Sequence, residues 1–341
     1  MDSTRGPGRI VVVYNESPFL IKGEPQDMLA EQGVIACSKA VAEALAGRCE
    51  VQRVPIHADV EVALAPYPPA EWVVFNLGEG IQGRLFEEAR IAWALEAMGY
   101  RITGSRGDAL ARSIQKVHAK RLFAHAGIPT PRWRVFRDAP ERLDGLGFPM
   151  IVKPVAEDGS LGIDPEAVVH DLPSLRARVS HTIECYRQAA LVEEFIAGRE
   201  FNVSLWGDAP DLLPLAEIDF HDFPDPFDKI VSFAAKWDAS SFAYHHTPVL
   251  CPAKVEESLA GRIQEAALDA WRVIGCQGYG RVDIRVDAKD QLHVIEVNCN
   301  PDLSPEAGFF QAVRRVGCSY QEMVCRIAEM TRDSLMADTR P

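Results

Sequence analysis

The side chains of Asp283, Glu296 and Asn298 carry oxygen atoms at a spacing that could hold a divalent cation. Alternating apolar and polar residues on both sides of a short turn at 288–291 predict a β-hairpin, whose register puts Asp283 directly opposite Glu296. The Cβ atoms of such a pair lie about 5 Å apart, and two carboxylates at that distance repel unless a cation separates them. Mg²⁺ takes oxygen ligands of this kind. We therefore predict a metal site; the alternative is a solvated face with ordinary ion pairs.

The same register has consequences for the rest of the hairpin. It pairs residue 287 with residue 292 and Arg281 with Asn298. Strict alternation along the second strand puts Val294 on the face that carries the carboxylate.

Lysines form a second group of residues that could take part in binding or catalysis. A helix predicted over 108–126 carries Lys116 and Lys120 one turn apart on one face, and two solvated lysines are the simplest interpretation of that pair. Lys153 is different because it interrupts the apolar strand 147–154, and buried lysines are rare unless they are paired.

A turn with two glycines, residues 157–162, directly follows that strand. Glycines let backbone N–H groups approach a phosphate, and the neighbouring Lys153 supplies positive charge. We interpret the strand and turn together as a phosphate-binding unit.

The segment 78–83, Gly-Glu-Gly-Ile-Gln-Gly, matches the dinucleotide fingerprint G-x-G-x-x-G. It follows the third predicted strand rather than the first, no acidic residue ends the next strand, and Glu79 would face a pyrophosphate. We therefore discount nicotinamide binding, and an oxidoreductase built on this loop is a minor alternative. A Gly-rich loop at the carboxyl end of a strand still suits a small polar ligand.

Composition limits the classes of function. The chain has 341 residues, 47% of them hydrophobic, and a formal net charge of −13, which argues against sequence-independent nucleic-acid binding. No apolar run approaches the roughly 20 residues that span a membrane, and no signal-peptide core follows the polar start. The eight cysteines form no C-x-x-C pair, so we expect a reduced, cytoplasmic protein without structural zinc. Cys299 falls on the opposite face from the carboxylates and is not expected to bind metal.

Hydrophobic periodicity divides the chain into unlike parts. Strands alternate with helices in the first hundred residues, which predicts a doubly wound α/β domain. Its predicted strands are 9–14, 51–56, 72–77 and 100–103, and its predicted helices are 28–47 and 85–98. Antiparallel strands and one helix follow, an α+β pattern, with strands at 190–196, 200–206 and 212–220 and a helix at 172–188. Residues 221–247 show no lasting periodicity and predict a lid loop that contains Lys236, and helices are expected at 256–274, 308–316 and 320–336.

The motifs, taken in order, resemble the ATP-grasp superfamily and, within it, the D-alanine–D-alanine ligase-like branch. No single motif is decisive, but the ordered set is specific and spans residues 9–330. It consists of Lys116, VKP at 152–154, GSLG at 159–162, EEFIAGREF at 193–201, AKW at 235–237, CPA at 251–253, GRVDI at 280–284 and EVNCNP at 296–301.

This resemblance implies three domains: residues 1–112 as an N-terminal α/β domain, 113–197 as the central ATP-grasp subdomain and 198–335 as the C-terminal one. It also implies a role for each matching residue. The implied ATP-binding residues are Lys116, Lys153, Ser160, Glu193, Glu194, Ile196 and Glu200. Asp283, Glu296 and Asn298 are the implied metal ligands, Arg281 and Lys236 the catalytic cations, and Glu79, Gly80 and Asp302 the substrate-binding residues.

The chain departs from the ligase pattern on the substrate side. Leu161 stands where the ligase has the second of two serines, Asp302 where it has glycine, and Ala307 near the place of a serine that holds the second amino acid. The first-strand motif that contacts the first D-alanine is not visible in YNESPF at 14–19. Positions for ATP and metal match while those for amino acids differ, which is the pattern of conserved chemistry with a changed substrate.

The resemblance therefore implies an ATP-dependent carboxylate–amine ligase that forms an amide through an acyl phosphate and releases ADP and phosphate. ATP and Mg²⁺, or Mn²⁺ in its place, are the expected cofactors. Small carboxylate and amine substrates, of the amino-acid class, are the expected partners, without nucleic acid or membrane, and a homodimer is compatible with this assignment. The alternative is a non-catalytic or regulatory ATP-binding relative, which the altered substrate positions favour and the presence of Lys236 and Arg281 disfavours.

Overall fold

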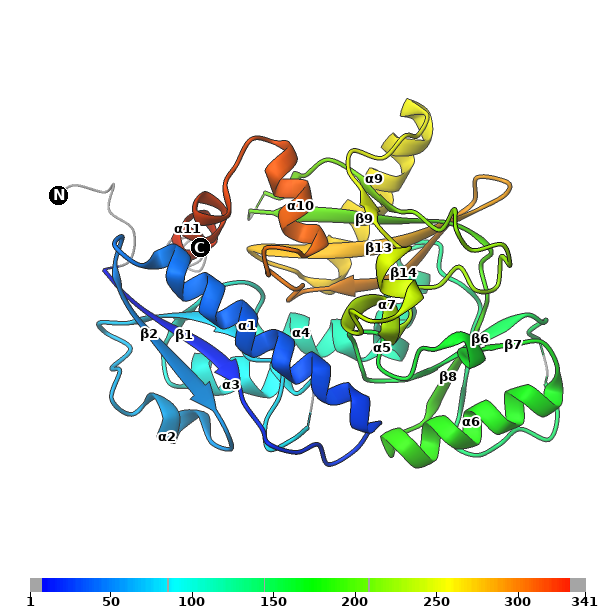
Figure 1. Cartoon of the computed structure of the whole chain (residues 1–341), viewed down its shortest axis with the longest axis horizontal. Coiled ribbons are helices and arrows are strands. Elements are labelled where there is room, and N and C mark those ends of the chain that lie inside the picture. The colour runs from blue at the N-terminus through cyan, green and yellow to red at the C-terminus, as the bar shows by residue number, and fades with distance from the viewer. Residues whose placement is uncertain (1–7, 85, 144, 208, 332–341) are drawn as a thin grey trace.

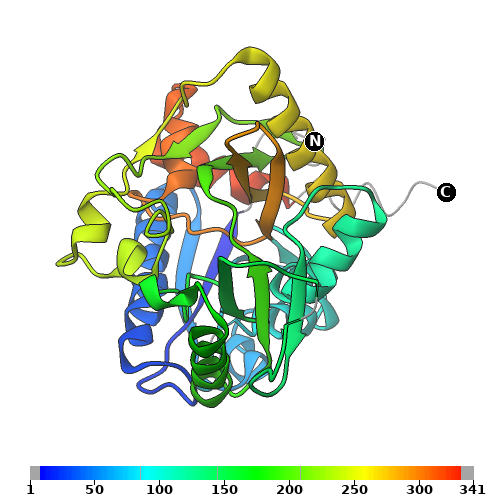
Figure 2. The same cartoon turned by 90° about the vertical axis from the view of Figure 1, so that its right-hand side faces the viewer.

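The computed structural model describes residues 8–84, 86–143, 145–207 and 209–331, and it contains three sheets with helices on their faces (Figures 1 and 2). A parallel sheet comes first, as the sequence predicts, and the antiparallel strands predicted at 190–220 are divided between two further sheets. Residue 85, the predicted start of one helix, and residues 332–336, where the last helix and the third domain were expected to end, lie outside the described residues. Within the described part of the chain, no helix combines the length and apolarity needed to cross a bilayer.

The N-terminal sheet is parallel throughout and has the order β2-β1-β3-β4. Its strands are β1 (Arg9–Asn15), β2 (Glu50–Ile56), β3 (Val73–Leu77) and β4 (Arg101–Ile102), and the helical segments around it are η1 (Pro25–Asp27), α1 (Met28–Leu45), α2 (Val60–Leu64) and α3 (Glu88–Ala97). Val12 of β1 packs with α1 on one face, while Val11 packs with α2 and α3 on the other. Helices on both faces explain why β1 is apolar along its whole length. The doubly wound prediction is confirmed.

The single helix predicted over 108–126 is wrong, because the structure has two helices there. They are α4 (Gly107–Ile114) and α5 (Lys116–His125), and the backbone leaves the helical conformation at Gln115. The N–H of Lys116 donates to the carbonyl of Val155 at 3.0 Å instead of bonding within a continuous helix. This break makes Lys116 the first residue of α5. It also brings Lys116 beside Val155, which directly follows the strand that carries Lys153.

The central sheet is antiparallel and has the order β5-β8-β6-β7. Its elements are β5 (Trp133–Phe136), β6 (Met150–Pro154), η2 (Pro165–Ala167), β7 (Val168–Val169), α6 (Leu172–Tyr186) and β8 (Ala190–Glu194). Asp171 and Ser174 form a reciprocal capping box that starts α6, and Arg187 ends it in the left-handed conformation. Leu175 and Val179 of α6 pack on the apolar face of β6 and β8.

The C-terminal sheet has the order β12-β11-β9-β13-β14, with β10 added on β9. Its strands are β9 (Gly198–Trp206), β10 (Asp211–Leu212), β11 (Ala216–Ile218), β12 (Val249–Leu250), β13 (Tyr279–Asp287) and β14 (Leu292–Asn298), and α9 (Glu257–Ile274) covers one face. The strand predicted over 212–220 is wrong: Pro214, which lacks an N–H for the ladder, lies between two short strands.

The predicted register of the β13–β14 hairpin is correct at the carboxylates and wrong at the turn. Asp283 pairs with Glu296 and Arg281 with Asn298, but a bulge after Asp283 shifts the rest, so that Val286 rather than residue 287 pairs with Leu292. The extra residue on β14 reverses the alternation of the strand. Consequently Val294 lies in the core cluster under α9, not on the face of Glu296 as strict alternation predicted.

Residues 221–247, the predicted lid loop, contain two short helices that periodicity did not reveal. They are α7 (Phe233–Trp237) and α8 (Phe242–His245), and the hydroxyls of Ser232 and Ser241 cap their N-termini. Helices of one turn carry too few residues for a periodic pattern. We keep the name lid for residues 221–247.

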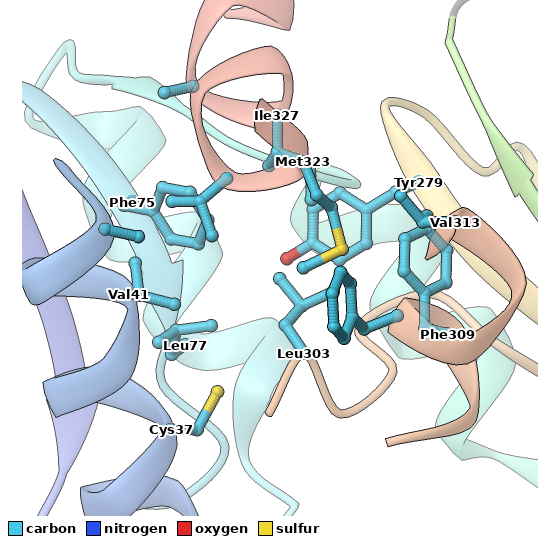
Figure 3. Packing of buried hydrophobic residues seen from close by; sticks show 14 of the residues in the cluster. Cys37, Val41, Phe75, Leu77, Tyr279, Leu303, Phe309, Val313, Met323 and Ile327 are labelled. Atoms are coloured by element: carbon cyan, nitrogen blue, oxygen red, sulfur yellow. The ribbon is translucent and has the colours of Figure 1, made fainter. Parts of the chain in front are cut away.

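The last two helices, α10 (Gly308–Arg315) and α11 (Tyr320–Met330), form no separate core but share one cluster with α1, the first sheet and residues of the C-terminal sheet. Figure 3 shows Met323 and Ile327 of α11 and Leu303 facing Phe75 and Leu77 of β3. The two ends of the described chain therefore share one hydrophobic cluster.

Candidate active site

The buried carboxylate of Asp283 lies on the face of the C-terminal sheet opposite α9, where residues of β9, β13 and β14 hold it in place. Arg281 donates two hydrogen bonds to it, from Nε at 2.6 Å and from Nη2 at 2.8 Å. The amides of Asn202 on β9 and Asn298 on β14 donate at 2.8 and 3.0 Å. Because Asn298 uses its N–H₂ group in this way, its carbonyl oxygen is left to accept a further partner.

Glu296, directly across the hairpin, lies among lysines. Lys116 at the start of α5 contacts its Oε2 at 2.8 Å. Burial would raise the pKa of the Glu296 carboxyl, but the ammonium groups of Lys116, Lys236 and Lys153 outweigh that effect and hold the pKa well below its usual value. Glu296 therefore carries its negative charge throughout the physiological range.

Lys236 on α7 and Asp158 on the turn after β6 complete this charged group. Burial and the nearby Glu296 raise the pKa of Asp158, while Lys116 and Lys236 oppose the rise. Lys236 acts on both Asp158 and Glu296, so the predicted lid lysine lies within electrostatic reach of Glu296, one of the predicted metal ligands.

Glu193 on β8 lies between two lysines from different elements. Its carboxylate forms ion pairs with Lys120 of α5 and, at 2.8 Å, with Lys153 of β6. Burial opposes ionisation, yet the two ammonium groups lower the pKa of Glu193 to about 2. Lys120 also donates to the hydroxyl of Thr130 at 2.7 Å. The ion pair with Glu193 therefore holds the side chain of Lys153, the predicted phosphate lysine, in place.

The turn after β6 is tied to the lid. Ser160, at φ +61°, donates its hydroxyl to the carbonyl of Val231 at 2.7 Å. The indole N–H of Trp237 donates to the carbonyl of Gly159 at 2.8 Å. The lid is thus packed over the turn in this structure, and Ser160 lies where the lid meets the predicted phosphate loop.

The remaining residues predicted for ATP binding lie along the edge where β8 runs into β9. Glu194 forms an ion pair with Arg132. Glu200 accepts two hydrogen bonds from the buried Arg285, at 3.0 and 2.7 Å, and Arg285 also donates to the carbonyl of Ile196 at 3.0 Å. Glu194, Ile196 and Glu200 therefore lie in one strip that borders the lysine cluster but is not part of it.

The predicted substrate residues lie on the other side of the lid. A cavity of about 20 Å³ is bordered by α1, β3, Trp237 of the lid and the loop after β14, and Glu79 and Asp302 are among its lining residues. Glu79 is buried enough, and close enough to Asp302, that the pKa of its carboxyl rises well above the usual value. Gly80, buried in the same Gly-rich loop, does not border the cavity. The described lining contains two carboxylates and no cationic side chain.

The donor set at the hairpin fits Mg²⁺. Carboxylates of Asp283 and Glu296 face each other, and the carbonyl of Asn298 is unused by the bonds above. All of these donors are oxygen atoms, which Mg²⁺ prefers, and the surrounding lysines suit the phosphates that usually accompany it. Cys299 is buried in the core beneath, 2.9 Å from Cys276 in sulfur-to-sulfur distance, and takes no part.

Several residues that organise the site were not assigned to it from the sequence. They are Lys120, Asn202, Arg285 and Asp158. Lys120 had a signal, its helical spacing from Lys116, but solvation was the simpler interpretation. Asn202 and Arg285 act across strands that are distant in sequence, and only the pairing of β9 with β13 reveals them.

Comparison with known proteins agrees with this architecture. Residues 122–329 match the family model described as the D-ala D-ala ligase C-terminus. An uncharacterized protein of Sinorhizobium fredii is 33% identical over 309 residues, which cover 90% of this chain and 88% of that protein. The D-alanine–D-alanine ligase of Bordetella avium is 30% identical over 267 residues, covering 76% of this chain and 79% of that one.

The fold is likewise that of a solved structure. The crystal structure of the D-alanine–D-alanine ligase from Bacillus anthracis complexed with ATP superposes with a TM-score of 0.75, at 20% identity, over 97% of this chain and 99% of that one. The expectation of an ATP-grasp architecture is therefore confirmed, and the chain belongs to the D-alanine–D-alanine ligase family.

Proposed function

We propose that this ATP- and Mg²⁺-dependent carbon–nitrogen ligase joins a carboxylate to an amine through an acyl phosphate and releases ADP and phosphate. One observation carries the proposal: Lys116, Lys153 and Lys236, from three different elements, all act on Glu296 beside the Asp283–Arg281 pair. Cations gathered around oxygen ligands are what a transferring phosphoryl group requires, because its charge spreads over its equatorial oxygens.

Each side chain has a part in this reaction. Lys116 and Lys153 hold the phosphates of ATP, and Lys236 covers the terminal phosphate from the lid. Asp283, Glu296 and Asn298 hold Mg²⁺, which when bound neutralises charge on the phosphates. Arg281, fixed by its two hydrogen bonds to Asp283, stabilises the charge that develops during transfer. The amine then displaces phosphate from the acyl phosphate.

Glu194, Ile196, Glu200 and Ser160 complete the nucleotide site in this proposal. The strip between β8 and β9 offers a backbone carbonyl and carboxylates at the open end of the lysine cluster, which suits adenine and ribose. Ser160 and the glycines beside it offer backbone N–H groups to the phosphates.

The acceptor amine is the substrate for which the cavity gives most information. Glu79 and Asp302 border it, its described lining has no cationic side chain, and the nearby Lys236 opposes the charge of Glu79 only weakly, so the carboxylate of a second amino acid would meet repulsion there. One unmade hydrogen bond to a charged group costs about 1.5–3 kcal/mol, or roughly 10–150-fold in affinity. We therefore propose an acceptor other than D-alanine, with a cationic group that pairs with Asp302. The cavity has room for about one water molecule, so the acceptor enters when Trp237 and the lid move.

The test measures ADP and phosphate release with D-alanine alone and with a panel of D- and L-amino acids, diamines and dipeptides, followed by mass analysis of the product. We expect ADP rather than AMP, and a faster reaction with a cationic acceptor than with D-alanine. D-alanyl-D-alanine synthesis at rates that the panel does not match would refute the acceptor proposal and leave the ligase proposal intact.

A second experiment separates a ligase from a regulatory ATP-binding protein. Lys236→Met should lower turnover by about 10²–10³-fold while nucleotide binding changes far less, because Lys236 serves the transferring group. Lys39→Met, on the exposed face of α1, is the matched control and should leave turnover unchanged. ATP binding without phosphate release under every carboxylate and amine tested would favour the regulatory alternative.

A further inference from the structure

Three potential metal ligands of different chemistry meet outside the active site, where the loop before α1 touches the end of α6. They are Glu24 on the loop and His181 and Cys185 on the helix, and their ligand atoms all lie within 4.8 Å of one another. The Cys185 sulfur is 3.3 Å from Glu24 Oε1, and His181 Nε2 is 3.4 Å from the same oxygen. None of the three belongs to the proposed reaction.

We propose that Glu24, His181 and Cys185 bind a divalent transition-metal ion of the Zn²⁺ type. Sulfur, imidazole nitrogen and carboxylate oxygen together form a donor set that Zn²⁺ accepts and that Mg²⁺ does not favour. The site is therefore chemically distinct from the all-oxygen site on the β13–β14 hairpin, and the two can be studied separately.

The distances suit a tetrahedral ion. Zinc lies about 2.0–2.3 Å from such ligands, which places neighbouring ligand atoms of a tetrahedron roughly 3.3–3.8 Å apart. Both distances to Glu24 Oε1, 3.3 Å from Cys185 and 3.4 Å from His181, fall at this spacing. The side chain of His181 is 44% exposed, so a water molecule can reach the fourth position.

The backbone already holds the ligands together. His181 and Cys185 are four residues apart on α6 and therefore point from the same face of the helix. The N–H of Gly23 donates to the carbonyl of Cys185 at 2.9 Å, which ties the loop to the helix beside the site. Asp27 accepts the N–H of Glu24 at 2.8 Å and lies 3.2 Å from the hydroxyl of Tyr186. Little ordering is left for a bound ion to impose.

The charges around Cys185 also favour a cation. Burial, followed by the carboxylates of Glu24 and Asp27, raises the pKa of the Cys185 thiol to about 12, against a smaller opposing effect of Arg178.

Such an ion would connect two parts of the molecule. The loop leads from β1 of the N-terminal sheet into α1, and α6 covers the central sheet. Figure 1 shows that the neighbouring ends of α1 and α6 lie close together. Metal binding would therefore stabilise the placement of the N-terminal half beside the central sheet, with no part in the chemistry.

Cobalt binding provides the test, because a thiolate ligand gives Co²⁺ a near-ultraviolet charge-transfer band that an all-oxygen site cannot give. The full chain, stripped with a chelator, is titrated with Co²⁺ and then with Zn²⁺. We expect one equivalent to saturate the band, Zn²⁺ to displace it, and millimolar Mg²⁺ to leave it unchanged. Cys185→Ser should abolish the band.

Two further variants make the test specific. His181→Gln changes an exposed side chain, so the fold should persist while affinity falls by more than the roughly 10–100-fold typical of an outer-shell change. Cys318→Ser, at a part-buried cysteine in the turn between α10 and α11, is the matched control and should keep the band. No band in the wild-type chain, or an equal band in Cys185→Ser, would overturn the proposal.

Discussion

Three carboxylates around the predicted metal and phosphate positions are each paired with a lysine or arginine. Glu296 faces Lys116, Glu193 faces Lys120 and Lys153, and Asp283 faces Arg281. Buried pairs of this kind contribute little net stability, because desolvation offsets their attraction, but removal of one partner leaves a costly unpaired charge. These pairs hold in place, without a ligand, the cations that we propose bind the phosphates of ATP.

Glu296→Gln tests the metal assignment at this scale. The variant keeps the size of the side chain but loses the charge that binds Mg²⁺ and pairs with Lys116. We expect a folded protein whose phosphate release falls by more than the roughly 10–100-fold typical of a residue behind the ligands. The measurement is turnover over a range of Mg²⁺ concentrations, with Glu265→Gln on the exposed face of α9 as control. Near-normal turnover at ordinary Mg²⁺ would remove Glu296 from the metal site.

The lowered pKa of Glu193 leads to a prediction about how the stability of the protein changes at acidic pH. Its pKa falls from 4.5 to about 2 on folding, so its contribution to stability is fully present above pH 4.5 and is lost as pH falls towards 2. This difference in pKa between the unfolded and folded states corresponds to roughly 3 kcal/mol of stability that depends on the ionisation of Glu193. Glu193→Gln should be less stable at pH 7, and its unfolding free energy should fall less steeply than that of the wild type between these pH values. Denaturant unfolding along a pH series measures both slopes, and equal slopes would show that Glu193 is not ionised against its lysines.

At the scale of elements, the lid is held to several parts of the molecule at once. Ser160 with Val231 and Gly159 with Trp237 join it to the turn after β6, and the ring of Trp237 packs against Gly33 of α1. Ile230 and Phe233 of the lid are buried in two small clusters with residues of the central sheet and of α1. Because its buried residues belong to small clusters, we expect the lid to open more easily than the sheets beneath it. Under the proposed function, substrate entry to the cavity and closure over ATP would then be movements of the same element.

Hydrogen exchange tests this view of the lid. Residues 221–247 should exchange quickly in the free protein and become protected when an ATP analogue and Mg²⁺ are added, because Lys236 then gains a phosphate partner. α9 serves as the internal reference and should not change. Unchanged protection across the lid, with nucleotide binding shown independently, would contradict the prediction.

The sequence predicts those elements whose hydrophobic pattern continues over several consecutive residues. Alternation located both hairpin strands and the Asp283–Glu296 pair, and apolar runs located β1 and β3. It failed where tertiary contacts override the pattern. The break before Lys116 depends on a carbonyl of Val155, far along the chain, and the bulge after Asp283 lets Val294 reach the core under α9. Lys120 was missed for the same reason, since its carboxylate partner is on β8.

At the scale of the whole molecule, the N-terminal sheet owes one of its faces to the C-terminal end of the described chain. Met323 of α11 is fully buried in the cluster that also contains Phe75 of β3 and Val12 of β1. Loss of contacts on α11 should therefore loosen strands that lie at the other end of the sequence.

Met323→Ala tests this coupling. Removing a fully buried Met side chain costs about 2–5 kcal/mol, because it loses burial and leaves a cavity. We expect that loss in the unfolding free energy, together with faster hydrogen exchange in β1 and β3. Val316→Ala, at a side chain that is 53% exposed, should change stability by no more than about 0.5 kcal/mol. Destabilisation confined to α10 and α11, with β1 and β3 unaffected, would argue against a shared core.

The shared cluster also bears on how proteins of this family can exchange parts. The Gly-rich loop and Asp302, the two acidic borders of the cavity, belong to opposite ends of the sequence but rest on the same core. A chimera that took only its first hundred residues from a relative would place a foreign sheet against α10 and α11, and it would combine half of one acceptor site with half of another. If the cavity takes the acceptor as we propose, acceptor specificity depends on two segments far apart in the sequence, and recombination at a single crossover would disrupt stability and specificity together.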